Sequence, residues 1–173
     1  MNSNPLLKTA MNFGAMSGLG SFAVFLGLYY KGISPLGNAS WLGAWIPVVF
    51  ICIATKNYRE HVLGGEISYG QAMKIGLTTA MAASFLFVLL IYIFATIIDG
   101  SVVEKLKAEQ IEQLDFSKLY FGDDFYSDLK DNVEKLTIKE IAFNDFFMKM
   151  IGALLVTFVT AAIYRKQNPE IED

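Results

Sequence analysis

The chain is poor in the side chains that build most catalytic and metal sites. It contains one cysteine, Cys52, and one histidine, His61, so it cannot form an intramolecular disulfide or gather several Cys and His ligands around zinc. Charged residues make up 18% of the 173 residues, against about 25% in soluble domains. The net charge of −3 excludes the basic surface that nucleic-acid binding requires.

Sequence motifs of catalysis are also absent. No phosphate-binding loop, dinucleotide fingerprint or nucleophile elbow occurs along the chain. We therefore predict that the protein is not an enzyme, that it uses no cofactor, and that it has no catalytic, cofactor-binding or metal-binding residues. An enzymatic alternative would rest on His61, beside Glu60 in a polar link, and we expect this histidine to be solvated.

The chain is rich in long stretches without charged residues. Apolar residues make up 54% of the chain. A helix needs about 20 apolar residues to cross a hydrocarbon core about 30 Å thick, so the sequence predicts a polytopic helical membrane protein. The charge-free stretches are 9–30, 32–55 and 75–98, and a shorter apolar stretch, 150–164, follows a polar segment.

The stretches predict an all-α fold, a four-transmembrane-helix bundle in one integral membrane domain, residues 1–173. The link after the first span is short and contains Pro35, so the first two spans should form an antiparallel hairpin. The last two spans form the second hairpin, with a small helical extracytoplasmic insertion, residues 100–145, between helices 3 and 4. The predicted spans are about 9–30, 41–58, 70–98 and 146–164, and the first is interpreted as a retained span rather than a cleaved signal.

Local signals predict where helices start. Three patterns of Ser or Thr followed three residues later by Glu or Gln predict capping boxes, and the last of them opens a helix that runs into the fourth span. Pro47 should bend the second span, because proline has no amide hydrogen for an intrahelical bond. The three pairs are Ser68 with Gln71, Ser101 with Glu104, and Thr137 with Glu140.

Small residues recur every four positions in the first and third spans. Such stripes allow helix backbones to approach closely, and Gly14-x-x-x-Gly18 is the tightest instance. Their similarity has two explanations, a duplicated hairpin as in transporters or two ordinary packing faces. The stripes can also pack either within one chain or between two copies. They are Ala10, Gly14 and Gly18 in the first span and Ala72, Gly76, Ala80 and Ser84 in the third.

Charged residues avoid the middle of every predicted span, which argues against an ion pathway across the membrane. Asp145 and Lys149, spaced i,i+4, should pair at the rim of the fourth span, where lysine can extend its ammonium group to water. The acidic residues of the polar segment lack the spacing of a calcium loop and are interpreted as a solvated helix face. Those acids are Asp123, Asp124, Asp128 and Asp131.

The distribution of lysine and arginine predicts the topology. Basic residues are denser on the side that holds both termini and the second link than on the side that holds the polar segment. Because basic residues favour the cytoplasmic side, we expect both termini inside and the polar segment outside. The basic residues on the predicted inner side are Lys8, Lys56, Arg59, Lys74, Arg165 and Lys166.

Five short motifs resemble those of one family. They are NPLLK at 4–8, GISPLG at 32–37, WIP at 45–47, K-x-Y-R at 56–59 and GG-x-ISYGQA at 64–72. Together they resemble the DUF4199 family, small integral membrane proteins of Bacteroidota with no assigned function. The resemblance covers most of the chain and is strongest over 4–98. It implies a bacterial inner membrane and four helices, and it brings no catalytic residues.

Two functions are compatible with these features. The leading interpretation is a scaffold, assembly factor or accessory subunit of a membrane complex, because the spans contain close-packing stripes and few converging polar groups. The alternative is a small transporter or lipid-handling membrane protein, suggested by the similarity of the first and third spans and by Pro47. The expected partners are the lipid bilayer and either another membrane protein or a second copy of the chain.

Overall fold

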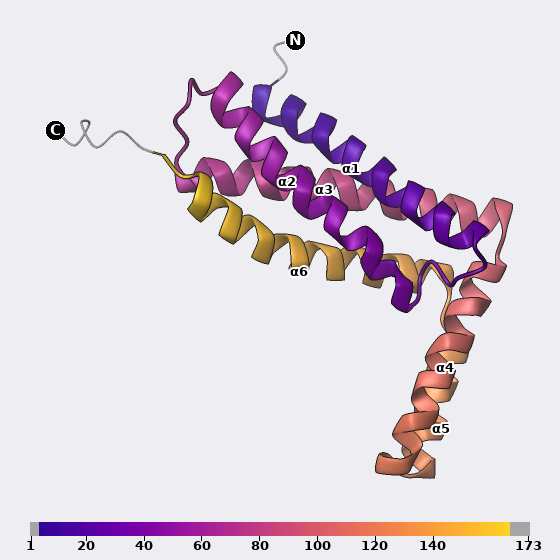
Figure 1. Cartoon of the computed structure of the whole chain (residues 1–173). Helices are drawn as coiled ribbons and strands as arrows, with labels where there is room; N and C mark the ends of the chain where they lie inside the picture. Colours follow the sequence, from indigo (N-terminus) through magenta and orange to yellow (C-terminus); the bar gives the residue numbers. More distant parts are fainter. Residues whose placement is uncertain (1–3, 167–173) are drawn as a thin grey trace.

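The computed structural model describes residues 4–166, with residues 116–121 and 124 described by their backbone alone, and this part of the chain is helical without strands (Figure 1). Each long apolar stretch forms one helix, because a hydrocarbon environment requires every backbone hydrogen bond to be made within the segment. The α-helices are α1 (Pro5–Tyr30), α2 (Trp41–His61), α3 (Tyr69–Ile93), α4 (Ser101–Phe121), α5 (Asp123–Glu134) and α6 (Ile138–Tyr164). A 3₁₀ turn, η1 (Asn38–Ser40), precedes α2, and a π-helical turn, η2 (Phe94–Ile98), extends α3.

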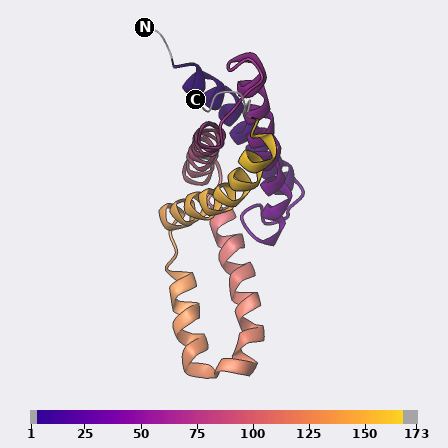
Figure 2. The same cartoon turned by 90° about the vertical axis from the view of Figure 1, so that its left-hand side faces the viewer.

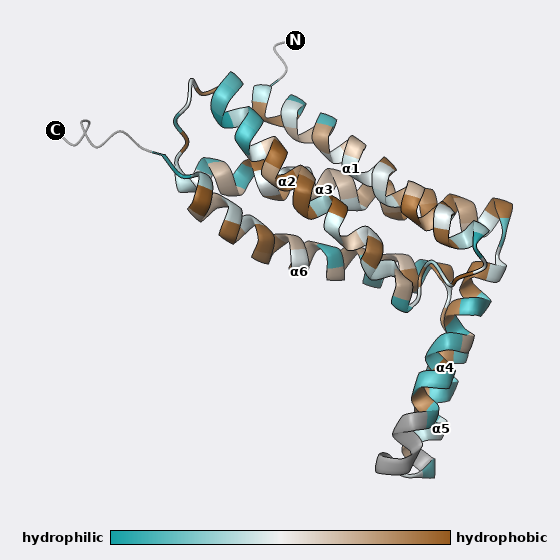
Figure 3. Cartoon of the chain, viewed as in Figure 1, coloured by the Kyte–Doolittle hydropathy of each residue, from teal (hydrophilic) through white to brown (hydrophobic). Residues whose placement is uncertain are grey.

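Four of these helices are long and apolar enough to cross a membrane, which indicates a membrane protein and confirms the all-α prediction. They are α1, α2 with η1, α3 with η2, and α6. Figure 3 shows that hydrophobic residues dominate these helices, whereas α4 carries many hydrophilic ones. Two helices start earlier than the apolar stretches predict, because Asn4 caps α1 ahead of Pro5 and the predicted box of Thr137 and Glu140 caps α6.

The four long helices lie side by side and alternate in direction. Figure 1 shows α1 and α3 running the same way, with α2 and α6 running opposite to them. Helix α3 packs against α1, α2 and α6, and its contacts with α1 and α6 are the most extensive between the long helices. Both described chain ends lie at one end of these helices, where Ile67 in the link before α3 exchanges backbone hydrogen bonds with Lys166.

Both stripes of small residues are buried inside the chain. A methyl group on Gly14 would lie 2.6 Å from Cβ of Ala82 and 2.8 Å from the carbonyl oxygen of Thr79, so α1 and α3 are in backbone contact. On the next turn, Gly18 approaches the carbonyl oxygen of Ala83 in the same way. Gly76, in contrast, meets Thr157 of α6. The stripes therefore bring three helices of one chain together, which answers whether they pack within the chain.

Helices α4 and α5 form a hairpin that projects from the end of the long helices opposite the chain ends (Figures 1 and 2). The base of α4 is part of the main core, where Val102, Val103 and Leu106 are buried in one cluster with Phe25 and Phe87. Further along α4, a carboxylate oxygen of Glu109 accepts a 2.8 Å hydrogen bond from the backbone N–H of Asn38 in η1. The hairpin is therefore fixed to the link between α1 and α2.

Asp99 joins three elements at the base of this hairpin. Its carboxylate accepts a 2.6 Å hydrogen bond from the hydroxyl of Tyr29 on α1, and 2.8 Å bonds from the N–H and hydroxyl of Ser101. The predicted box of Ser68 and Gln71 is present at the start of α3. The prediction for Ser101 is wrong in detail, because Ser101 is already the first residue of α4 and its hydroxyl donates to Asp99.

Asp99 should make the hairpin junction sensitive to acid. The hydroxyl of Tyr29, together with Ser101, holds the pKa of the Asp99 carboxyl below its ordinary value of 3.8. A lowered carboxyl pKa contributes stability above about pH 3.8, and that contribution is lost as the pH falls through the folded-state pKa. We expect the melting temperature of Asp99→Asn to lie below that of wild type at pH 7, and this gap in melting temperature to narrow towards pH 3. Thermal unfolding in detergent measures this gap, with Asp128→Asn on exposed α5 as control; a gap that stays constant with pH would contradict the assignment.

Candidate functional site

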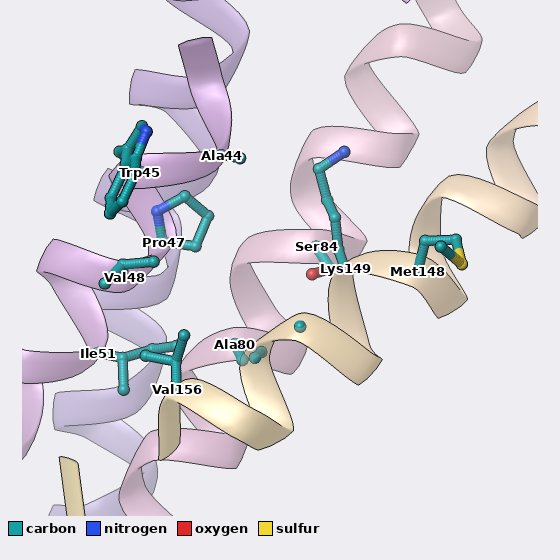
Figure 4. A pocket seen from close by; sticks show the side chains of 12 residues that line it. Ala44, Trp45, Pro47, Val48, Ile51, Ala80, Ser84, Met148, Lys149 and Val156 are labelled. Atoms are coloured by element: carbon teal, nitrogen blue, oxygen red, sulfur yellow. The ribbon is translucent and has the colours of Figure 1, made fainter. Parts of the chain in front are cut away.

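Helices α2 and α6 are in contact towards the chain ends. There Cys52 Sγ lies 3.5 Å from Thr160 Oγ1, and the guanidinium of Arg59 lies 5.4 Å from the centre of the Tyr164 ring. Towards the hairpin end the two helices separate, and α3 forms the floor between them (Figure 4). The result is a groove between α2 and α6, which we call the α2–α6 groove.

The α2–α6 groove contains a cavity of about 490 Å³, within the usual range for small-molecule pockets. Its walls are apolar apart from Ser84 and Lys149, and its outer edges are exposed, since Trp45 and Met148 are 63% and 61% exposed. Figure 4 shows Lys149 extending from α6 past Ser84, with the α2 side chains on the far side. The lining residues are Ala44, Trp45, Pro47, Val48, Ile51, Ala80, Ser84, Met148, Lys149, Gly152, Ala153 and Val156.

Asp145 and Lys149 form the ion pair that their spacing predicts, at the hairpin end of the groove. The Lys149 ammonium donates to Asp145 Oδ1 and also lies 4.3 Å from the centre of the Phe87 ring, where it makes a cation–π contact. Phe87 is a buried residue of α3, so the ammonium group packs on the neighbouring helix as well as on Asp145. The position at the rim of the fourth span stays a prediction.

A second, smaller cavity of about 20 Å³ adjoins the ion pair on the side of the α1–α2 link. Asp145, Lys149, Ser21 and Ser40 supply its polar groups. Asp145 Oδ2 and Ser21 Oγ are both buried, and neither has a hydrogen-bond partner among the described residues. Buried polar atoms are normally hydrogen-bonded, so the small cavity is a place where a donor is missing.

The arrangement separates apolar and charged contacts along one groove. The large cavity has apolar walls. At its end, the ion pair places one positive and one negative group next to the small cavity. Such a site suits a molecule with an apolar chain and a polar head, because the chain avoids water while the head finds hydrogen-bond partners.

The other residues that the sequence singled out lie away from this groove. His61 is exposed, and its Nδ1 lies 3.3 Å from both Nδ2 and the carbonyl oxygen of Asn57 on its own helix. In α5, Asp131 pairs with Lys135 at 4.0 Å, and the side chain of Asp124 lies outside the described residues. Across the described part of the chain, no three His, Cys, Asp or Glu residues gather closely enough to hold a metal ion.

Sequence reasoning predicted the ion pair but missed the groove residues around it. The spacing of Ser84 predicts only a packing role, and no motif marks Gly152. One signal was available: Gly152 follows Lys149 by three residues, which places a residue without a side chain on the same helix face as the charge.

Comparison with known proteins identifies one family. No curated protein and no solved structure matches the chain. A model of the family described as "Protein of unknown function (DUF4199)" matches residues 12–166, which is most of the chain and includes every residue that lines the α2–α6 groove. The chain therefore belongs to the DUF4199 family, as the five motifs predicted.

Proposed function

We propose that this protein is a non-catalytic, lipid-binding membrane protein whose α2–α6 groove takes an amphiphile from the surrounding bilayer. The observation that carries the proposal is the apolar groove of about 490 Å³ that ends at the Asp145–Lys149 pair. Of the two functions that the sequence suggests, this favours the lipid-handling alternative.

The proposal places the protein in a bacterial inner membrane with both termini inside. The four long helices then form a bundle of two antiparallel hairpins, and α4 and α5 form the extracytoplasmic insertion. The basic residues at the end with the chain termini, such as Lys56, Arg59 and Lys166, support this orientation. In this orientation the ion pair lies on the outer side of Gly152 and Val156, so the polar head of the amphiphile would face the outer leaflet.

The position of the groove supports entry from the side. Trp45 and Met148, at its edges, are well exposed in the isolated chain and would face lipid in a membrane. Pro47 lines the groove on α2 and has no amide hydrogen for the Gly43 carbonyl, which weakens the helix where it separates from α6. A lipid chain that enters between α2 and α6 would therefore not need to open the contacts of α1 with α3.

Filling the groove should remove the bound lipid. A Cβ atom at Gly152 would meet nothing within 4 Å, so Gly152→Phe adds a ring to the groove without forcing the helices apart. We expect at least about tenfold less retained lipid, equivalent to about 1.4 kcal/mol of binding free energy. Native mass spectrometry of protein purified in mild detergent measures the lipid retained per chain.

The matched control is Gly27→Phe. Gly27 is also a helical glycine with open space at its Cβ position, but it lies on α1 and lines neither of the two cavities described above. Gly27→Phe should retain lipid as wild type does. Equal lipid retention by Gly152→Phe and wild type would refute the proposed function.

A second candidate function, an accessory subunit or scaffold, is favoured by the α4–α5 hairpin. The hairpin projects from the long helices while its base is held by the core and by the bond from Asn38 to Glu109 (Figures 1 and 2). A protruding element with a fixed base can hold a partner on the outer side of the membrane. A photo-crosslinker at Asp128, exposed on α5, should then capture a defined protein in native membranes. If it captures only lipid, this candidate fails.

A further inference from the structure

We propose that the amphiphile is a phospholipid with a primary ammonium headgroup, whose ammonium occupies the small cavity and whose phosphate contacts Lys149. This inference rests on the proposed function, because it identifies the ligand class of the same groove. It is carried by three features of the ion-pair end: the charge balance, two buried oxygen atoms without donors, and the volume available beside them.

The charge balance favours a headgroup that carries both signs. Asp145 and Lys149 already neutralise each other, so a purely anionic or cationic head would leave one net charge in an apolar setting. A head with one phosphate and one ammonium leaves the site neutral. Its phosphate can accept a hydrogen bond from the Lys149 side chain. That side chain has three N–H donors, and one of them is directed to Asp145 Oδ1.

The two oxygen atoms without donors favour a primary ammonium. Asp145 Oδ2 and Ser21 Oγ lie on the same small cavity, are buried, and have no hydrogen-bond partner among the described residues. A primary ammonium can donate one hydrogen bond to each and still keep a third N–H. A trimethylammonium group has no N–H and would leave both oxygen atoms unsatisfied.

The volume of the small cavity also favours a primary ammonium over a trimethylammonium group. Its size, about 20 Å³, exceeds the roughly 10–15 Å³ of probe-occupied volume that one water molecule needs. A primary ammonium is close to a water molecule in size, whereas three methyl groups on the nitrogen make it several times larger. Lys149 lines both cavities, so a phosphate beside it would lie between an ammonium in the small cavity and a chain in the large one.

A competition experiment on the full chain tests this assignment. Detergent-purified protein is mixed with equal amounts of phosphatidylethanolamine, phosphatidylcholine and phosphatidylglycerol that carry identical acyl chains, and native mass spectrometry counts each bound lipid. We expect phosphatidylethanolamine to be retained about tenfold over the other two, the factor that one or more charged hydrogen bonds supply. Asp145→Asn should reduce this preference, and Lys149→Met should reduce the bound amount of all three lipids.

The possible outcomes separate the two proposals. If Gly152→Phe removes all three lipids but wild type binds them equally, the groove holds lipid and the headgroup assignment is wrong. A preference for phosphatidylglycerol would also overturn it, since the site would then select net negative charge. If Gly152→Phe leaves retention unchanged, the groove is not the lipid site and both proposals fail. The double variant Asp145→Asn/Lys149→Met keeps the test valid if a single variant unfolds, and it should bind lipid without headgroup preference.

Discussion

Gly14→Leu should be among the most destabilising single substitutions in this chain. Even the first carbon of a side chain at this position would lie 2.6 Å from Cβ of Ala82 and 2.8 Å from the carbonyl oxygen of Thr79. A backbone oxygen cannot move aside without shifting α3, and α3 also contacts α2 and α6. Overpacking of this kind costs about 1–3 kcal/mol for added methylene groups, and leucine adds several. We therefore expect thermal unfolding in detergent to shift down by about 10 °C.

Gly27→Leu is the control for this prediction. It makes the same chemical change in the same helix, but at a site where an added Cβ meets nothing within 4 Å. Its melting temperature should stay close to that of wild type, and Gly14→Ala should fall between the two. Similar melting temperatures for the two leucine variants would mean that α1 and α3 do not approach as closely as described.

The close-packed residues could be predicted from the sequence, but their partners could not. The spacing of Gly14 and Gly18 identifies a face without side chains, and both residues are buried against α3. The third-span stripe gives no sign that it faces a helix other than α1. Gly76 of this stripe packs against Thr157 of α6, whereas Gly14 and Gly18 of α1 approach Thr79 and Ala83, which lie outside the stripe. Which helix covers which face depends on crossing angles, and these depend on all the side chains at the contact.

The candidate site shows the same division between local and tertiary information. The pairing of Asp145 with Lys149 is a property of one helix, since residues four apart share a face, and the sequence predicted it correctly. The sequence predicts that Lys149 lies at the rim of the fourth span, because it precedes the fourth apolar stretch. The contact of its ammonium with the Phe87 ring depends on how α6 packs on α3, and the sequence of α6 does not show it. The separation of α2 from α6, which creates the groove, leaves no periodic pattern in either helix.

Helix starts were predictable where one residue and its near neighbours decide them. Ser68 and Thr137 form the expected capping boxes with residues three positions later. At the start of α4 a tertiary contact changes the outcome, because Tyr29 on α1 and Ser101 share the carboxylate of Asp99. A local motif therefore predicts the approximate position of this helix start but not the residue that caps it.

The second large expected effect is a double-mutant cycle at the ion pair. Lys149→Met should leave Asp145 with an unpaired charge between the two cavities, and Asp145→Asn should leave Lys149 unpaired in the same way. Removing one partner of a buried pair costs about 3–5 kcal/mol, and a lone charge within a membrane helix costs about 2.5–3.5 kcal/mol. The side chains of Asp145 and Lys149 are 27% and 24% exposed. Because the pair is partly exposed, we expect each single variant to lose about 3 kcal/mol of unfolding free energy, the lower end of the range for a buried pair.

The double variant decides whether the pair or the individual side chains matter. Methionine and asparagine keep the approximate shapes of lysine and aspartate, so Asp145→Asn/Lys149→Met removes both charges with little change in packing. Its free energy of unfolding should lie within about 1 kcal/mol of the wild-type value, because well-packed neutral groups can replace a buried pair at little cost. Chemical unfolding in mixed micelles gives all four free energies. If the two single losses simply added in the double variant, each side chain would act alone, and the charge balance at the end of the groove would have no role in stability.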